Sequence, residues 1–275
     1  MPRRFLFLLL TAFQLLFSSP APEESVVLPI LMYHDVSCEN PGKDVVTPEE
    51  LRADLTWLRS RGYRPVTMAR VIAYVDGEAL LPENPIVLSF DDGYTSAYDR
   101  VLPLLREADM PMVLSVIAGS ADEFSAYRPG KARPAHAAWG QLRELADSGL
   151  VELQNHSYDL HRARGGGWGC DRLPGEGRGA YEERLAADAL LAQERIWTET
   201  GRLPAVFTYP YGRYCEESEE ALRELGFRAT LTCDFGVNLL SRDPDCLFAL
   251  KRICRSHGAD LASLLEEANE TLKWR

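Results

Sequence analysis

Short apolar runs alternate with longer amphipathic segments along most of the chain. Several runs are apolar at nearly every position, which is typical of strands buried on both faces of a parallel sheet. We expect eight strands, at Leu28–His34, Tyr63–Met68, Pro85–Phe90, Pro111–Gly119, Leu150–Ser157, Ala205–Gly212, Phe227–Cys233 and Leu247–Arg255.

The segments between these runs carry helix signals. Thr47–Gly62 begins with a capping threonine and a proline and ends at a glycine. Pro103 interrupts Ser96–Met110, so we expect that helix to kink or to start late. The remaining expected helices are Trp139–Gly149, Glu182–Gly201, Glu216–Gly226 and Gly258–Trp274. This alternation predicts one α/β domain, most simply a (β/α) barrel of seven or eight strands.

The N-terminus departs from this alternation. A basic start, MPRR, is followed by the apolar run Phe5–Phe17 and by small polar residues, which is the layout of a secretory signal. The apolar run is shorter than the ~20 residues that a membrane-spanning helix needs. We expect residues 1–25 to be a cleaved signal, with an uncleaved anchor as the alternative. The folded domain, residues 26–275, would then be secreted or face the cell envelope.

Composition narrows the classes of partner. The formal net charge of −11 argues against a nucleic-acid surface, which needs clustered lysine and arginine. Six cysteines permit disulfides in an exported protein, but their pairing cannot be read from the sequence. None of them lies in a CxxC pair, so a thiolate zinc site has little support.

Polar residues gather where the expected strands end. His34 ends the first, Asp91 and Asp92 follow the third, His156 ends the fifth with His161 five residues later, and Arg252 lies near the end of the last. The ends of parallel barrel strands share one face, where the chemistry of such folds takes place. The long Gly- and Arg-rich segment His161–Tyr181 follows a strand end and should border the same face.

Two histidines and a carboxylate are a common ligand set for a divalent metal. We expect Asp92, His156 and His161 to hold one such ion, with Zn²⁺ first and Co²⁺, Ni²⁺ or Fe²⁺ as alternatives. The ion would offset the repulsion between the paired aspartates, leaving Asp91 ionised as a base. The plainer alternative is that Asp92-Gly93 is a surface turn and that the histidines are structural.

Other candidates have plainer interpretations. Tyr209 and Tyr211, in YPYG, could be core aromatics. His136 lies in a Pro/Ala loop and is interpreted as solvated, and His257 as an ordinary surface histidine.

Three short motifs resemble those of the polysaccharide deacetylases, carbohydrate esterase family 4, which share the NodB homology domain. SFDDG resembles the family's first motif, HSYDLH its second and YPYG its third, and the likeness extends from Leu28 to the C-terminus. The resemblance implies a distorted (β/α) barrel that hydrolyses N-acetyl groups on an N-acetylglucosamine-containing polysaccharide and releases acetate. It also implies that Asp91 is the base, that Asp92, His156 and His161 hold the metal, and that the Tyr211 backbone N–H binds the oxyanion.

The sequence departs from the family pattern in two places. The third motif usually carries an arginine near the base, but Thr208 occupies that position, and we expect Arg252 to replace it by pairing with Asp91. Many members take the catalytic acid from a late histidine, whereas LMYH resembles the poly-β-1,6-N-acetylglucosamine deacetylase branch, in which a first-strand histidine serves. This resemblance favours His34 over His257 as the acid.

Two alternative functions remain open from the sequence. One is hydrolysis of another carbon–nitrogen bond on the same barrel, such as a peptidoglycan-linked amide. The other is a carbohydrate-binding relative that has lost turnover, which the missing motif arginine leaves open.

Overall fold

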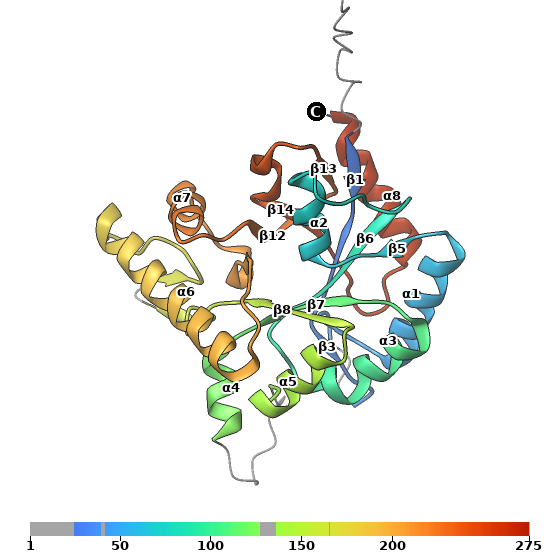
Figure 1. Ribbon diagram of the computed structural model, residues 1–275, viewed down its shortest axis with the longest axis horizontal. Helices are drawn as coiled ribbons and strands as arrows, with labels where there is room; N and C mark the ends of the chain where they lie inside the picture. Colours follow the sequence, from blue (N-terminus) through green and yellow to red (C-terminus); the bar gives the residue numbers. More distant parts are fainter. Residues whose placement is uncertain (1–24, 40–41, 127–135, 165, 275) are drawn as a thin grey trace, which may run out of the picture.

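The computed structural model describes residues 25–39, 42–126, 136–164 and 166–274. Among these residues, seven parallel strands form a closed ring in the order β2-β14-β12-β11-β8-β7-β6, with β6 pairing back to β2 (Figure 1). The strands are β2 (Ile30–Tyr33), β6 (Pro85–Phe90), β7 (Met112–Val116), β8 (Val151–Asn155), β11 (Val206–Thr208), β12 (Ala229–Phe235) and β14 (Leu250–Cys254). The expected (β/α) barrel is confirmed.

The ring is not uniform, which is the distortion that the family resemblance implied. β2 pairs with β6 over four residue pairs, whereas β8 and β11 meet only at Phe207 and Asn155. The side chain of Gln154 bridges the weak join, because its Oε1 accepts hydrogen bonds from the N–H groups of Ala205 and Val206 at 2.9 and 2.8 Å. A side chain thus satisfies donors that the strand ladder leaves unpaired.

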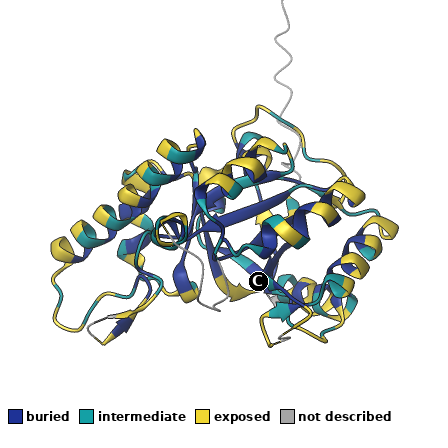
Figure 2. Ribbon diagram, turned by 90° about the horizontal axis from the view of Figure 1, so that it is seen from below, coloured by how far each residue is buried: buried dark blue, intermediate teal, exposed yellow. Residues whose placement is uncertain are grey.

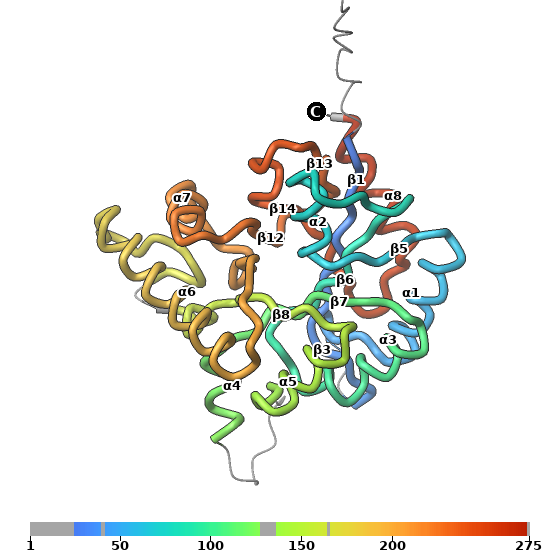
Figure 3. The backbone as a smooth tube through the Cα atoms, viewed as in Figure 1, coloured from blue at the N-terminus to red at the C-terminus, as the bar shows by residue number. Residues whose placement is uncertain are grey.

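Eight α-helices in the described part of the chain surround the ring (Figures 1 and 3). They are α1 (Pro48–Ser60), α2 (Met68–Val75), α3 (Leu102–Ala108), α4 (Ala118–Ser125), α5 (Trp139–Asp147), α6 (Arg178–Thr200), α7 (Glu216–Glu224) and α8 (Leu261–Glu270). The strands are buried while the helices expose their outer faces (Figure 2). The core therefore lies within the ring and between the ring and its helices.

Short elements connect this frame. The two-residue or three-residue strands are β1 (Val26–Leu28), β3 (Asp35–Val36), β4 (Val45–Val46), β5 (Arg64–Pro65), β9 (Ala163–Arg164), β10 (Gly167–Trp168) and β13 (Asn238–Leu240). 3₁₀ turns form at Pro210–Gly212, Pro244–Leu247 and Thr271–Trp274. β9 and β10 make an antiparallel hairpin inside the long Gly- and Arg-rich segment.

The second expected strand is much shorter than predicted. Only Arg64–Pro65 pairs, with β6 and outside the closed ring. Pro65 has no N–H to donate to a ladder, and the Thr67 side chain then accepts from the N–H of Arg70 and starts α2. α2 and α4 were not predicted from the sequence, and α6 begins at Arg178, four residues before the expected Glu182.

The helix that carries Pro103 starts late, as expected. A π-helical turn at Ala97–Val101 precedes α3, and the N–H of Leu102 bonds to the carbonyl of Ala97, five residues back. Pro103 then lies in the first turn of α3, where a missing N–H costs little.

The expected N-terminal signal, residues 1–25, falls almost wholly outside the described residues. Within the described ranges, no helix is both long enough and apolar enough to cross a bilayer. All six cysteines are described, and none of them forms a disulfide.

Candidate metal centre and active site

The two neighbouring aspartates point to different partners because the backbone turns sharply between them. Asp91 continues the alternation of β6, on the same side as Ser89, and is buried. Asp92 and Gly93 have φ angles of 70° and 71°, in the left-handed region. The N–H of Gly93 bonds back to the carbonyl of Asp91 at 2.9 Å. This turn separates the carboxylates and so limits their repulsion.

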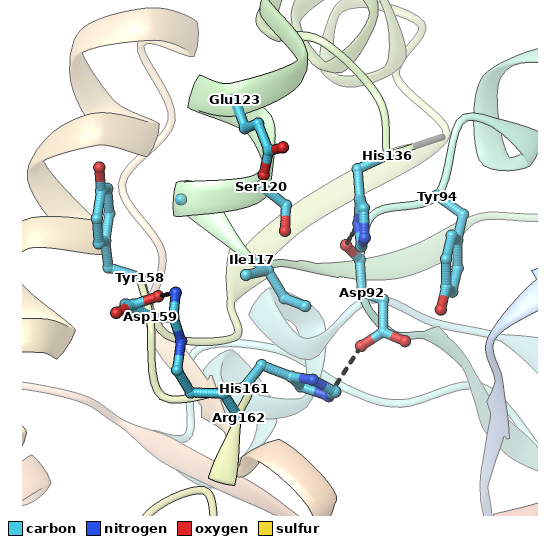
Figure 4. Close-up of a pocket in the computed structure, with 11 residues that line it drawn as sticks. Asp92, Tyr94, Ile117, Ser120, Glu123, His136, Tyr158, Asp159, His161 and Arg162 are labelled. Carbon is cyan, nitrogen blue, oxygen red and sulfur yellow. Dashed lines mark hydrogen bonds and ion pairs between the residues drawn. The ribbon is translucent and has the colours of Figure 1, made fainter. Parts of the chain in front are cut away.

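Asp92 meets both motif histidines at one point. Its Oδ1 lies 3.3 Å from Nε2 of His156 and 3.2 Å from Nε2 of His161 (Figure 4 shows the second contact). All three candidate ligand atoms lie within 4.8 Å of one another. Although Oδ1 is buried, it makes no hydrogen bond to any described residue.

The rings are oriented by other groups. Nδ1 of His156 donates to the backbone carbonyl of Thr208 at 2.8 Å, which leaves Nε2 as the lone-pair nitrogen facing Asp92. The hydroxyl of Tyr211 donates to the carbonyl of His161 at 3.1 Å, and the two rings pack with centroids 4.1 Å apart. The Thr208 contact fixes which nitrogen of His156 is free to bind a metal, while Tyr211 holds His161 through its backbone and by ring packing.

Electrostatics in this cluster favour an ionised carboxylate. Burial by itself would raise the pKa of Asp92, but the imidazoles of His156 and His161 outweigh it and hold that pKa well below its ordinary value. Burial and the neighbouring His156 lower the pKa of His161 to about 4. Burial also works to lower the pKa of His156, but the Asp92 and Asp91 carboxylates raise it overall.

These residues fit a divalent cation. Two imidazole nitrogens and one carboxylate oxygen converge, and the oxygen is a buried acceptor without a donor. A buried polar atom without a partner is costly, and a cation bound between the three groups would satisfy it. The donor set of nitrogen and oxygen suits Zn²⁺ and its first-row neighbours.

Asp91 is held by a two-pronged ion pair with Arg252. Nη1 and Nη2 of the guanidinium donate to Oδ1 and Oδ2 of Asp91, both at 2.8 Å. The side chains of Arg252 and Asp91 are 0% and 3% exposed. Nε of Arg252 also donates to the carbonyl of Thr232 at 2.6 Å. Burial would raise the pKa of Asp91, but Arg252 and then His156 lower it below its ordinary value.

Thr208 and Arg252 have separate polar partners. Thr208, at the motif position, is fully buried, and its Oγ1 lies 2.7 Å from Oγ of Ser115. Nη1 of Arg252 also donates to Oγ of Ser89 at 3.2 Å. The expected pairing of Arg252 with Asp91 is therefore present in the structure, with the guanidinium supplied by β14.

The two histidines considered as acids lie in different surroundings. His34 follows β2, is half-buried, and is close enough to Asp91 and Asp92 to contribute to the lowering of both pKa values. His257 is 41% exposed, and its Nδ1 pairs with Oε2 of Glu50 at 2.8 Å. Of these two histidines, His34 is the one that contributes to the electrostatics of the paired aspartates.

The two tyrosines of YPYG lie in different environments. Tyr209 is fully buried and stacks on Tyr214 with ring centroids 4.9 Å apart, so its interpretation as a core aromatic is correct. Tyr211 is 43% exposed, has a φ of 58° and lies against His161.

His136 is not simply solvated, so that interpretation was wrong. It is half-buried, and its Nδ1 lies 2.8 Å from the backbone carbonyl of Asp92. Its ring stacks on Tyr94 with centroids 4.9 Å apart. A bridge between Tyr94 and His136 joins a Pro/Ala segment to the turn after β6, and nothing in the local sequence pattern signals it.

A pocket of about 460 Å³ opens beside Asp92 and His161 (Figure 4). Tyr94 and His136 form one wall, and α4 contributes Ser120 and Glu123. The Arg162 guanidinium pairs with Asp159 on the opposite side. Asp92 and His161 line this pocket, whereas His156 is buried.

Comparison with known proteins agrees with the motifs. The family model named polysaccharide deacetylase matches residues 80–230, which include Asp91, Asp92, His156, His161 and the YPYG turn. The chain belongs to the polysaccharide deacetylase family. The resemblance read from the motifs is thereby confirmed, and the family is one of deacetylase enzymes.

Individual relatives point to one branch of the family. The poly-β-1,6-N-acetyl-D-glucosamine N-deacetylase of Escherichia coli K12 is 32% identical over 244 residues, covering 81% of this chain and 36% of that protein. The BpsB deacetylase domain from Bordetella bronchiseptica superposes with a TM-score of 0.69 at 28% identity, covering 88% of this chain and 100% of that one. IcaB from Ammonifex degensii gives 0.70 at 26%, covering 88% and 95%.

The deacetylase from Escherichia coli is much longer than the part that matches. This chain therefore corresponds to a little over a third of that relative.

Proposed function

We propose that this protein is a metal-dependent N-deacetylase that removes acetyl groups from an N-acetylglucosamine-containing polysaccharide. The observation that carries the proposal is the buried, hydrogen-bond-free Oδ1 of Asp92, placed between Nε2 of His156 and Nε2 of His161. The names of the curated relatives support the substrate class.

In this proposal Asp92, His156 and His161 hold the divalent ion, with Zn²⁺ expected first. The ion would supply Lewis acidity and make a bound water more acidic, as it does in other metal-dependent hydrolases.

The remaining residues move or orient protons and charge. Arg252 keeps Asp91 ionised and fixed, and each carboxylate oxygen retains a lone pair that can accept a proton from the attacking water. His34 donates a proton to the departing amine nitrogen, because an amine anion is a poor leaving group. The Tyr211 backbone N–H donates to the oxyanion that develops on the acetyl carbonyl.

Acetate release tests the proposal. The chain is incubated with N-acetylglucosamine oligomers before and after chelator treatment, and then with Zn²⁺, Co²⁺, Ni²⁺ or Fe²⁺ added singly. We expect release of acetate, its loss with chelator, and its recovery with at least one ion. No release from any oligomer with any of the ions would overturn the proposal.

We further propose that the protein works outside the cytoplasm, in the envelope or as a secreted enzyme, delivered by its N-terminal signal. Support comes from the basic start and apolar run of residues 1–17. Comparison of the N-terminal residue of the exported protein with the start of the gene product tests this directly. An intact Met1 in a cytoplasmic fraction would contradict it.

A further inference from the structure

Two exposed aromatic rings continue from the metal centre across the protein surface. Tyr211 lies against His161, and Trp168 meets Tyr211 edge to face with ring centroids 5.4 Å apart. The side chain of Trp168 is 53% exposed. A large aromatic ring left half in water forgoes much of the free energy that its burial would provide. A ligand that covers the Trp168 ring would recover this free energy.

The Trp168 ring is held in place by the hairpin that carries it. The backbone of Gly169 packs directly on the turn at Pro210, because a Cβ on Gly169 would lie only 2.5 Å from the Pro210 carbonyl oxygen. Asp171 accepts a hydrogen bond from the N–H of Trp168 at 3.2 Å. The same carboxylate pairs with Arg213 at 3.0 Å. These contacts tie the β9–β10 hairpin to the segment that carries Tyr211.

The spacing relates this surface to the reacting sugar. The path from the metal centre runs from His161 to Tyr211, with ring centroids 4.1 Å apart, and then to Trp168. Trp168 is thus two ring contacts away from the metal ligand. A pyranose ring is about as large as an aromatic ring. When one sugar of the polymer lies at the metal centre, the next sugar can therefore reach Trp168. The faces of pyranose rings carry C–H groups that pack well on aromatic rings. An aromatic side chain that is already held in position loses little conformational entropy when the sugar binds.

We propose that Trp168 and Tyr211 form a subsite, the aromatic platform, that binds the sugar next to the one being deacetylated. This inference rests on the proposed function for the chemical class of its ligand. It makes Trp168 a specificity residue that selects polymers over single sugars.

Binding of N-acetylglucosamine and of its pentamer to chelator-treated protein, measured by titration calorimetry, tests the platform without turnover. Trp168→Ala is compared with Trp168→Phe, which keeps a ring, and with Trp197→Ala on α6. Trp197 is the matched control because its side chain is also 53% exposed. Unfolding temperature and metal content are measured for each variant to show that it is folded.

We expect Trp168→Ala to weaken pentamer binding about tenfold relative to monomer binding, Trp168→Phe to retain most of the affinity, and Trp197→Ala to behave as wild type. Unchanged pentamer affinity in Trp168→Ala, or an equal loss in Trp197→Ala, would overturn the platform. Should Trp168→Ala fail to fold, an affinity of Trp168→Phe far below wild type would count against stacking.

Failure of the proposed function gives a different pattern. If the wild-type chain binds the pentamer through Trp168 but releases no acetate, the deacetylase proposal falls and the platform stands. If it releases acetate and Trp168→Ala does not alter pentamer binding, only the platform falls.

Discussion

At the scale of single residues, the backbone conformation directs neighbouring side chains toward different partners. The left-handed conformation of Asp92 turns its carboxylate toward two imidazoles, while Asp91 stays aligned with β6 and meets Arg252. The same logic distinguishes Tyr209, buried on the strand side, from Tyr211, exposed after the turn. Each of these differences can be tested by substitution.

The metal ligands should be separable from the base. Asp92→Ala, His156→Ala and His161→Ala should each lose bound metal and activity, because a site with three protein ligands has none to spare. Asp91→Asn should keep its metal and lose turnover. Elemental analysis of purified variants measures this, and a full complement of metal in His156→Ala would show that the ligand assignment is wrong.

His34 should affect chemistry without affecting metal content. His34→Ala should lower kcat by about 10²–10⁴, the usual contribution of a positioned acid, with little change in bound metal. His257→Ala should keep wild-type kcat, because His257 is at the surface and pairs with Glu50. Steady-state kinetics on an N-acetylglucosamine oligomer decide the point. Loss of turnover in His257→Ala with none in His34→Ala would assign the acid to the late histidine.

Removing Arg252 should destabilise the protein through the charge it leaves behind. Arg252→Met keeps much of the side-chain volume but leaves the Asp91 carboxylate, whose side chain is 3% exposed, without its counter-ion. We expect a loss of about 3–5 kcal/mol in the free energy of unfolding. The double variant with Asp91→Asn should recover part of that loss, because the buried charge is gone. Urea unfolding of the wild type, the two single variants and the double variant measures this, and strictly additive losses would argue against the coupling.

At the scale of elements, one carboxylate joins the start of α1 to the segment after β14. Oε2 of Glu50 accepts from the Thr47 N–H at 2.7 Å and lies near His257, and Oε1 accepts from the Gly258 N–H at 2.7 Å. Although burial would raise the pKa of Glu50, these hydrogen bonds lower it from 4.5 to about 2.

The sign of the pH effect follows from this lowered pKa. A carboxyl with a depressed pKa in the folded state stabilises the protein above its unfolded pKa and loses that effect as the pH falls. Glu50→Gln should therefore cost about 1–2 kcal/mol at pH 7. Its difference from wild type should shrink between pH 4.5 and about 2. Glu49→Gln, in the same helical turn, is the control for a simple effect of the helix dipole. A pH-independent difference in urea unfolding would refute this explanation.

Most elements could be predicted because burial on both faces leaves a continuous apolar run. The prediction failed where tertiary contacts decide the outcome. Tyr63–Met68 has the composition of a strand, yet only Arg64 and Pro65 pair with β6. Thr67 then caps α2, which begins at Met68. α4 was missed because its short, small-residue sequence has a weak apolar stripe, and it is fixed by packing beside Tyr158. Local patterns record which residues are buried, not which neighbour covers them.

At the scale of the whole molecule, the candidate site is assembled by closure of the ring. His34, Asp91, His156 and Arg252 come from four strand ends that are distant in sequence, and the expectation that they share one face agrees with the structure. His136 shows the limit of that reasoning. It reaches the pocket through a loop contact with Tyr94, and no strand-end rule could have identified it.

The late position of Arg252 in the sequence also determines when Asp91 can be paired during synthesis. Asp91, Asp92, His156 and His161 all precede residue 208, the position at which the family motif usually carries its arginine. Here a ribosome must deliver β14, Leu250–Cys254, before Asp91 has a counter-ion. A nascent chain that stops short of β14 carries all three expected metal ligands, but its ring cannot close and Asp91 has no counter-ion. Synthesis of β14 is therefore required both to close the ring and to pair Asp91.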